Sequence, residues 1–543
     1  MKLKKTSAVL AGLASVTLLA ACSKQNDSQN KTKQVLNWTE STTIATQDPS
    51  LATDTTSFNT LLNTQEGLYR LDKKQNPKPA LAVKTKISQG GKVYDFTLRK
   101  NAKWSNGQPV TAKDFVYAYR RTVNPKTKAS MAFYLYQIKN AKEINLGQKA
   151  VNTLGVKAIS KYHLQITLTR PVSYFKRLLA FPLFFPQNKQ AVAKYGDKYG
   201  TQAKYLVFNG PYRLTKWTGS NKKWTLVKNK TYWDQKKVHL TKINELVTES
   251  TTTSYNLYQA KETDETLLTG SQVKANQQNA AYHQRKASAL SRLELNQNKV
   301  KAFTNLKIRR AISLAINRNS LTNNILQDGS TPAKGFVPSG MGYNPKTKQA
   351  FQDEAYDKSA VSYNLKKAKQ LWQEGLKEEG ISSLTVTLSA SDTDSAKKVA
   401  AFLQSSLAKL PGLNVEVQTI PYTQLITKQG KKDYEMTLKN WQAILADPIN
   451  FLDIFEKDSS YNNSGYNDNE FDRLLDETEN KYGNQPQKRW ERLVAAEKVL
   501  MATQGTIPLY QVAKPQLLRI SVKNVLYNPT GCPYDFKTAS ISK

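Results

Sequence analysis

Apolar and polar residues alternate along two short stretches of the C-terminal half, residues 384–388 and 413–417. Alternation with period two is typical of a half-buried β-strand. Between these stretches, residues 395–410 place their apolar side chains on one helical face, and Pro411-Gly412 then ends the helix. The apolar side chains are Val399, Phe402, Leu403, Leu407 and Leu410. A strand, a helix and a second strand in this order predict a βαβ unit with parallel strands.

The N-terminal half also carries the strand pattern, at residues 93–98 and at Leu164, Ile166 and Leu168. No internal repeat and no long Pro-, Gly- or Ser-rich linker divides the chain. We therefore expect an α/β protein, with mixed α+β structure in the N-terminal half and a parallel α/β lobe in the C-terminal half.

The first residues carry the features of an export signal. Three lysines precede an apolar run at 8–21, which is shorter than the about 20 residues that a membrane-spanning helix needs. The run ends in Leu19-Ala20-Ala21-Cys22, which resembles the lipobox of bacterial lipoproteins, where the cysteine becomes the lipidated first residue. We expect a signal peptide at 1–21, lipidation of Cys22 and a polar tether at 22–34. An ordinary signal peptide with a chance cysteine is the alternative.

The composition is strongly basic. The 543 residues include 80 Lys and Arg against 42 Asp and Glu, a formal net charge of +38, which predicts an anionic neighbour. Because an exported chain does not meet the chromosome, we expect anionic lipid headgroups or cell-wall polymer rather than nucleic acid. The 27 Tyr, 17 Phe and 8 Trp can build a large core, which excludes a disordered or fibrous chain.

The sequence contains no recognisable catalytic motif. The three histidines, His163, His239 and His283, lie in no metal-binding or nucleophilic pattern, and no phosphate-binding glycine loop occurs. A metal site is one interpretation of the acidic residues at 468–472. We favour a helix start instead, with Asn467 as the cap and Glu470 completing a capping box. We predict no enzymatic activity, no cofactor and no metal.

A series of short motifs follows in order from about residue 40 to the C-terminus. They are Glu66-Gly67-Leu68-Tyr69, Gly91-Lys92-Val93-Tyr94-Asp95-Phe96, Trp104-Ser105-Asn106-Gly107, Asn209-Gly210-Pro211-Tyr212, Arg310-Ala311-Ile312, Asp447-Pro448 and Ile507-Pro508-Leu509-Tyr510. Together they resemble the oligopeptide-binding protein family, the peptide-type extracellular solute-binding proteins of bacterial ABC importers. A single such motif is weak, whereas the ordered set is specific.

The resemblance implies two lobes around a deep cleft, a two-strand hinge and an extra subdomain on the first lobe. By motif position, lobe I would comprise residues 35–78, 207–295 and 513–543. The extra subdomain would comprise 79–206, and lobe II 296–512. The predicted βαβ unit falls inside lobe II. We expect the protein to act as a monomer.

The family binds an extended peptide by pairing with its backbone, which accepts many sequences because side chains are not recognised. Carried over by motif, Glu66-Gly67-Leu68 would pair with the peptide from lobe I, and Asn440-Trp441-Gln442 from lobe II. For Trp441, simple core packing is the alternative.

One position departs from the family pattern. The family commonly reads Trp-x-Ala-Asp-Tyr-Pro-Asp-Pro, and the first Asp receives the peptide's α-ammonium. This chain reads Trp441-Gln442-Ala443-Ile444-Leu445-Ala446-Asp447-Pro448, so Ile444 replaces that carboxylate. Either another acid holds the ammonium, or the ligand lacks a free N-terminal amine. A blocked peptide, a cell-wall peptide or a signalling peptide is a ligand of the second kind.

The resemblance implies a lipid-anchored receptor on the extracellular face of the cell membrane. It would sequester peptides by closure of its lobes and deliver them to an ABC transporter permease. A signalling-peptide receptor without a role in nutrient uptake is one alternative, and a non-peptide ligand such as a sugar is another. A basic adhesion protein that binds wall polymer or host matrix is a third, and its binding would weaken as salt rises.

Overall fold

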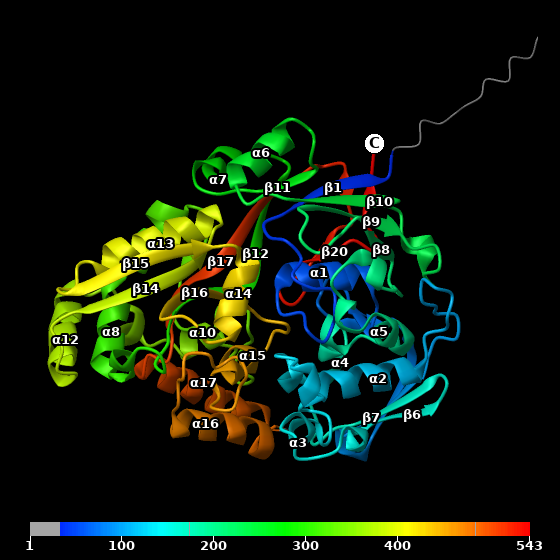
Figure 1. Cartoon of the computed structure of the whole chain (residues 1–543), viewed down its shortest axis with the longest axis horizontal. Helices are drawn as coiled ribbons and strands as arrows, with labels where there is room; N and C mark the ends of the chain where they lie inside the picture. Colours follow the sequence, from blue (N-terminus) through cyan, green and yellow to red (C-terminus); the bar gives the residue numbers. More distant parts are fainter. Residues whose placement is uncertain (1–32, 173, 484) are drawn as a thin grey trace, which may run out of the picture. The chain divides into compact units, whose positions relative to one another are not determined.

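The structure is a computed structural model that describes residues 33–172, 174–483 and 485–543 (Figure 1). Residues 34–543 form one compact unit. The predicted signal peptide, Cys22 and nearly all of the predicted tether lie outside the described residues. Within the described ranges, no helix is both long and apolar enough to cross a bilayer.

The first sheet joins distant parts of the chain. Its strand order is β1 (Val35–Glu40), β10 (Lys242–Val247), β9 (Lys223–Lys228) and β8 (Tyr212–Thr215). β1 is parallel to β10, and the other pairs are antiparallel. Trp38 is buried in β1, with its ring centroid 4.7 Å from that of Tyr534 and 5.0 Å from that of Phe536. The first and last described segments therefore share one core.

A second four-stranded sheet lies entirely within residues 79–206, the range predicted for the extra subdomain. Its strand order is β4 (Ala82–Ser88), β5 (Val93–Leu98), β7 (His163–Thr167) and β6 (Val156–Ser160), all antiparallel. β5 and β7 confirm the strands predicted from alternation. The next helix, α2 (Ala112–Val123), begins after Thr111, whose backbone N–H donates to the Asp114 carboxylate at 2.7 Å.

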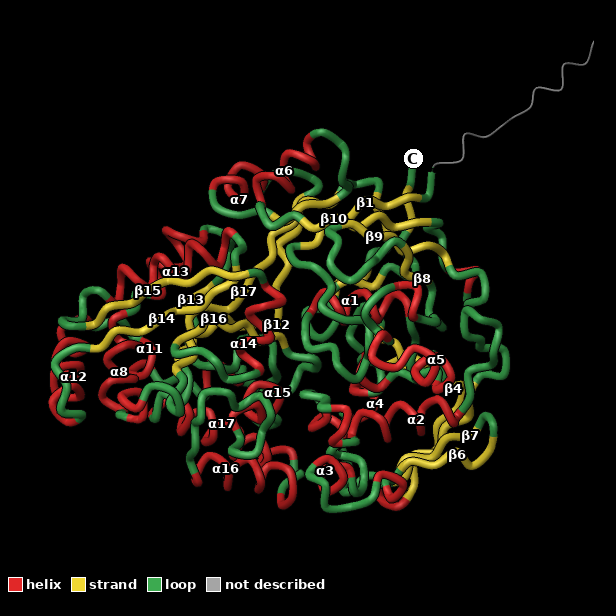
Figure 2. The backbone as a smooth tube through the Cα atoms, viewed as in Figure 1, coloured by secondary structure: helices red, strands yellow, loops and turns green. Residues whose placement is uncertain are grey.

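The largest sheet contains the predicted βαβ unit (Figure 2). Its strand order is β11 (Glu265–Leu267), β17 (Ile507–Leu518), β12 (Tyr282–Leu295), β16 (Met436–Gln442), β14 (Leu384–Ser391) and β15 (Leu413–Ile420), with β13 (Thr331–Pro332) beside β17. β14 and β15 pair in parallel along their full length, and α13 (Asp394–Leu407) connects them. The unit is confirmed, although α13 ends at Leu407 and not at the predicted residue 410.

Two long antiparallel strands, β12 and β17, form the centre of this sheet and lie side by side in Figure 1. β17 also pairs with β11, and β12 also pairs with β16. The predicted lobe boundaries at 295/296 and 512/513 fall at the end of β12 and inside β17. The boundaries themselves stay predictions.

Helix α16 (Asn469–Asp476) corrects one expectation from the sequence. Its N-cap is Asp468, whose carboxylate accepts the backbone N–H of Phe471 at 3.0 Å. Asn467 lies one position too early for its side chain to reach that N–H. Glu470 pairs with Arg473 at 2.7 Å instead of completing a capping box. Within the described residues, no group of three or more His, Cys, Asp or Glu could hold a metal ion.

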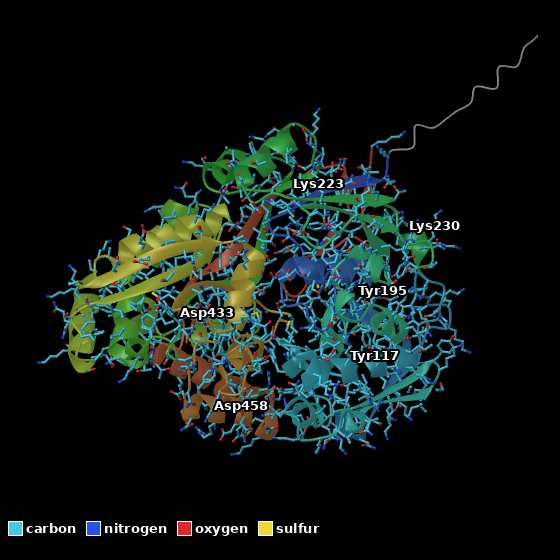
Figure 3. All side chains as sticks on the ribbon, in the orientation of Figure 1. Tyr117, Tyr195, Lys223, Lys230, Asp433 and Asp458 are labelled. Atoms are coloured by element: carbon cyan, nitrogen blue, oxygen red, sulfur yellow. The ribbon has the colours of Figure 1, made fainter. Side chains whose placement is uncertain are left out.

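The other helices and short strands complete the unit. The helices are α1 (Thr55–Thr64), α3 (Ala141–Asn145), α4 (Phe175–Leu178), α5 (Lys189–Tyr195), α6 (Thr251–Gln259), α7 (Ser271–Asn276), α8 (Leu306–Ala315), α9 (Arg318–Ser320), α10 (Phe351–Glu354), α11 (Lys358–Val361), α12 (Leu365–Glu378), α14 (Tyr422–Gly430), α15 (Ile449–Leu452) and α17 (Pro486–Ala502). The strands are β2 (Tyr69–Leu71), β3 (Pro77–Pro79), β18 (Val522–Lys523), β19 (Leu526–Tyr527), β20 (Tyr534–Asp535) and β21 (Ser540–Ile541). Charged side chains such as Lys223 of β9 and Lys230, Asp433 and Asp458 of the loops are exposed (Figure 3).

Candidate ligand-binding cavity

A cavity of about 440 Å³ is bounded by segments that are far apart in the sequence. This volume lies within the range of about 300–1,000 Å³ that is common for small-ligand sites. One part of its wall is formed by residues 53–56 at the start of α1, and another by residues 438–442 of β16. The wall also includes residues of β1, β12, α14 and β17. The cavity therefore lies where the two sheets that contain β1 and β16 approach each other.

The end of β16 has an unpaired edge at the cavity. β12 pairs with β16 over the whole strand, from Met436 to Gln442. On the other side, β14 pairs with β16 only at Met436 and Thr437, so no described strand lies beside residues 438–442 on that side. The side-chain amide of Gln429 in α14 donates to the Leu438 carbonyl at 3.0 Å. The backbone beyond Leu438 can pair with an extended ligand.

Asn440, Trp441 and Gln442 all border the cavity, and the ligand-binding role inferred from the motif stays a prediction. Asn440 is exposed, and the Gln442 amide donates to the Gly531 carbonyl at 3.2 Å. Trp441 is 8% exposed, and its indole N–H donates to the Asn450 carbonyl at 2.6 Å. Trp441 thus packs in the core and also borders the cavity, so both interpretations of this residue describe part of its environment.

Ile444 also borders the cavity, and its backbone N–H donates to the Asn450 side-chain oxygen at 2.7 Å. Asp447, the acid retained from the family pattern, does not border the cavity. Its two carboxylate oxygens accept hydrogen bonds from Arg489 at 2.9 and 3.0 Å. Asp447 is therefore occupied within the protein and does not replace the carboxylate that is absent at position 444.

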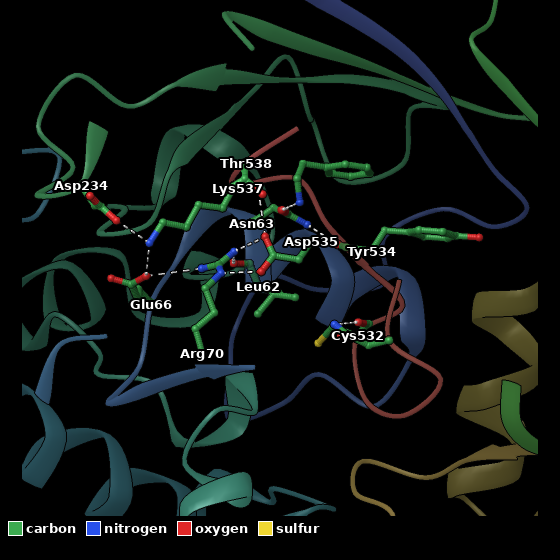
Figure 4. A network of polar contacts seen from close by, with 12 residues as sticks. Leu62, Asn63, Glu66, Arg70, Asp234, Cys532, Tyr534, Asp535, Lys537 and Thr538 are labelled. Atoms are coloured by element: carbon green, nitrogen blue, oxygen red, sulfur yellow. Dashed lines mark hydrogen bonds and ion pairs between the residues drawn. The ribbon is translucent and has the colours of Figure 1, made fainter. Parts of the chain in front are cut away.

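The other predicted segment, Glu66-Gly67-Leu68, is not among the residues that border the cavity. Figure 4 shows the Glu66 carboxylate facing Arg70 and Lys537. Glu66 is fully buried and accepts hydrogen bonds from the Tyr232 hydroxyl at 2.6 Å and from the Trp233 indole. The Gly67 and Leu68 carbonyls accept the N–H groups of Leu81 and Ala80, each at 3.0 Å. This carboxylate and these two carbonyls bind other parts of the protein, and the ligand-pairing role inferred from the motif stays a prediction.

Asp54 is a cavity residue that the motif comparison missed. It is the N-cap of α1, where its Oδ1 accepts the Ser57 N–H at 2.9 Å, and it is only 3% exposed. Burial raises the pKa of Asp54. Burial, and after it the charge of Asp54, raises the pKa of both Tyr422 and Tyr461, which border the same cavity. The sequence Asp54-Thr55-Thr56-Ser57 signals a helix start, but no local pattern signals a cavity.

The cations on the cavity wall have acidic partners of their own. Glu294 lies 2.9 Å from Arg292 and 2.7 Å from Lys439. Burial opposes ionisation of Glu294, but Lys439 and Arg292 together lower its pKa to about 2. Burial lowers the pKa of Lys514, and the charge of Glu40 opposes this shift. The wall therefore carries charges of both signs, and its cations are largely compensated.

Residues of the range 79–206 contact residues of the range 296–512 directly. The Asn450 amide donates to the Tyr134 hydroxyl at 2.7 Å, and the rings of Phe133 and Tyr461 lie 5.8 Å apart. Arg170 and Glu479 form an ion pair at 2.7 Å. These contacts hold the two predicted parts against each other.

Comparisons with known proteins agree with this architecture. The family model described as bacterial extracellular solute-binding proteins, family 5 Middle, matches residues 76–463. The chain is 34% identical to a dipeptide-binding protein of Lactococcus lactis, over 97% of each chain. It is 38% identical to the solved structure of Listeria monocytogenes OppA bound to peptide, with a TM-score of 0.90 over 94% of this chain and 100% of that one. It is also 38% identical to the pheromone receptor PrgZ, with a TM-score of 0.89 over the same shares of the two chains. The predicted two-lobe α/β fold is confirmed.

Proposed function

We propose, because the chain belongs to the bacterial extracellular solute-binding proteins of family 5, that it captures extended peptides in the cavity and delivers them to an ABC transporter permease. The likeness to OppA bound to peptide and to a dipeptide-binding protein supports a peptide as the ligand. The protein acts as a receptor and not as an enzyme.

The unpaired edge of β16 is the observation that carries this proposal. An extended peptide presents a row of N–H and C=O groups, and an unpaired strand edge is the surface that can satisfy them. Residues 439–442 offer such an edge beside a cavity that also has room for side chains. Backbone pairing of this kind accepts many sequences, which suits a receptor for mixed peptides.

Closure of two lobes sequesters the peptide in this proposal. Lobe I comprises 35–78, 207–295 and 513–543, with the extra subdomain at 79–206, and lobe II comprises 296–512. The contacts between ranges 79–206 and 296–512, such as Asn450 with Tyr134, support a closed state. β12 and β17 connect the lobes and act as the hinge.

The proposed location is the extracellular face of the cell membrane. Lipidation of Cys22 anchors the monomeric protein, and the tether at 22–34 separates the anchor from the folded unit. A net charge of +38 favours association with anionic lipid and cell-wall polymer. Because Ile444 offers no charge, ligands without a free N-terminal amine remain acceptable at that position.

Mass spectrometry of whatever co-purifies with residues 23–543 tests the proposal. We expect peptides, and we expect calorimetric binding of a recovered peptide to persist when NaCl rises from 0.1 to 0.5 M, because a sequestered ligand is not held by surface charge. X-ray scattering should show a smaller radius of gyration with the peptide bound. A protein that carries no peptide and binds wall polymer only at low salt would be an adhesion protein.

A receptor for one signalling peptide is the second candidate. The 38% identity to the pheromone receptor PrgZ supports this candidate, and it equals the identity to Listeria OppA that supports the first. The same mass spectra separate the two candidates, because a nutrient receptor should yield many sequences and a signalling receptor a single one.

A further inference from the structure

Asp54 has one carboxylate oxygen that is bound and one that is free. Oδ1 accepts the Ser57 N–H and so completes the helix cap. Oδ2 is buried and accepts no hydrogen bond from any described residue. Capping needs only one oxygen, so the second is available to a ligand. A buried carboxylate oxygen without a partner is unfavourable, and a cation in the cavity would relieve that cost.

Two aromatic rings accompany this carboxylate on the cavity wall. Tyr422 is the first residue of α14, and Tyr461 packs at a ring-centroid distance of 5.0 Å from Trp441. The faces of tyrosine rings attract cations, which adds to the attraction of a carboxylate. The three side chains come from residues 54, 422 and 461, and only the folded chain brings them to one cavity.

The protein's own cations do not neutralise Asp54. Arg292 and Lys439 border the cavity, but both pair with Glu294. Lys514 interacts with Glu40. No Lys, Arg or His within the described ranges lies within ion-pair distance of Asp54. A cationic group of the ligand can therefore supply the charge that completes this site.

We propose that Asp54, Tyr422 and Tyr461 form a cation subsite of the cavity that receives an ammonium group of the bound peptide. This inference rests on the proposed function. The ammonium is either the N-terminal amine or a lysine side chain, because both present the same charged group. The first source would place the acid that position 444 lacks at the start of α1. The second would allow a peptide with a blocked N-terminus.

The test compares the unmutated protein with Asp54→Asn, since asparagine caps a helix as well as aspartate does. The probes are tetra-alanine, its N-acetylated form and N-acetylated tetrapeptides with one lysine at each position in turn, measured by calorimetry. A lysine-free peptide identified by mass spectrometry, in its acetylated form, serves as a neutral reference. Asp433→Asn makes the same change at an exposed carboxylate that pairs with Lys299, and it is the matched control.

For an N-terminal source, we expect the unmutated protein to bind tetra-alanine at least tenfold more tightly than its acetylated form. For a side-chain source, one lysine peptide should gain at least tenfold over acetylated tetra-alanine. Asp54→Asn should abolish either difference, Asp433→Asn should preserve it, and binding of the neutral reference should change less than twofold. Tyr461→Leu should reduce the difference several-fold, whereas Tyr461→Phe, which keeps the ring, should retain it.

Binding of peptides without a preference for either ammonium would overturn the subsite and leave the proposed function intact. A preference that survives Asp54→Asn would also overturn it and assign the ammonium to another acid. If none of the peptides binds, including those recovered from the protein, the proposed function itself is overturned. Thermal melting of both variants checks the fold, and loss of the cap would appear there as a lower Tm.

Discussion

The guanidinium of Arg170 lies 2.7 Å from the carboxylate of Glu479, although more than 300 residues separate them in the chain. The Tyr174 hydroxyl donates to the same carboxylate at 3.5 Å. Arg170 belongs to the range predicted as the extra subdomain, and Glu479 to the range predicted as lobe II. The pair therefore bridges two parts that must separate if the cavity opens to admit a peptide.

Arg170→Ala should weaken peptide binding by about 1.4- to fivefold, because the closed state loses an ion pair worth about 0.2–1 kcal/mol when partly exposed. The side chains of the pair are 18% and 27% exposed, which places them in that class. Calorimetry with a recovered peptide measures the effect, and scattering of the empty protein should show a larger radius of gyration. Arg473→Ala is the control, since Arg473 pairs with Glu470 and Glu477 of its own helical segment. Equal losses in both variants would exclude a bridging role for Arg170.

Ile444→Asp should raise the ratio of free-amine to N-acetylated peptide affinity at least tenfold relative to the unmutated protein. The new carboxylate would border the cavity where the family pattern places the acid that binds the α-ammonium. Because Ile444 is 8% exposed, the charge should also lower the stability of the empty protein by about 1–3 kcal/mol. Calorimetry of one peptide pair and urea unfolding measure these effects. Ile444→Val is the control and should leave the ratio unchanged, and an unchanged ratio in Ile444→Asp would contradict the role assigned to this position.

Cys22→Ala should move the protein from the membrane fraction to the medium, or leave it as an unprocessed precursor. Two acyl chains give stable anchoring where one gives only marginal binding, so loss of a diacylglyceryl group should be decisive. Fractionation and immunoblotting of cells that express each form give the measurement. Cys532→Ala is the control, because Cys532 is buried and its replacement should leave the location unchanged. Normal cleavage and membrane retention in Cys22→Ala would refute the lipoprotein assignment.

Ionisation of the buried Glu497 carboxyl should lower the free energy of unfolding as the pH rises toward neutrality. Its Oε1 accepts the N–H groups of Phe336 at 2.5 Å and Val337 at 3.3 Å, and burial raises its pKa to about 7. Because folding raises the pKa of this carboxyl, its contribution to the free energy of unfolding is fully present below its unfolded pKa of about 4.5. This contribution is lost as the pH rises through about 7.

Glu497→Gln should remove this loss. Between pH 4.5 and pH 8, the free energy of unfolding of the variant should therefore rise by about 2–3 kcal/mol relative to that of the unmutated protein. Urea unfolding at several pH values gives the measurement. Glu491→Gln, at an exposed position of the same helix, should keep the pH dependence of the unmutated protein. An identical pH dependence in the unmutated protein and Glu497→Gln would show that Glu497 ionises normally.

The sequence by itself determined the elements whose burial pattern is local. The alternation at 384–388 and 413–417 and the intervening helical face became β14, β15 and α13, because a sheet or helix buries one side at a fixed period. The ordered motifs identified the family, and the absence of an acid at position 444 was visible without coordinates. Helix ends were less certain, as the cap at Asp468 shows, because Asn467 and Asp468 are both residue types that cap helices.

Only the tertiary structure decided which polar groups meet. Glu66 lies in a conspicuous motif, yet its carboxylate binds Tyr232, Trp233 and Arg70 within the protein. Asp54 lies in an ordinary helix start, yet it borders the cavity together with Tyr422 and Tyr461 and keeps one buried carboxylate oxygen without a hydrogen-bond partner. A local sequence pattern reports whether a side chain is buried, since burial depends on periodicity. It does not report the partner, because Tyr232 and Trp233 are brought to Glu66, and Tyr422 and Tyr461 to the cavity beside Asp54, by packing between segments that are distant in the sequence.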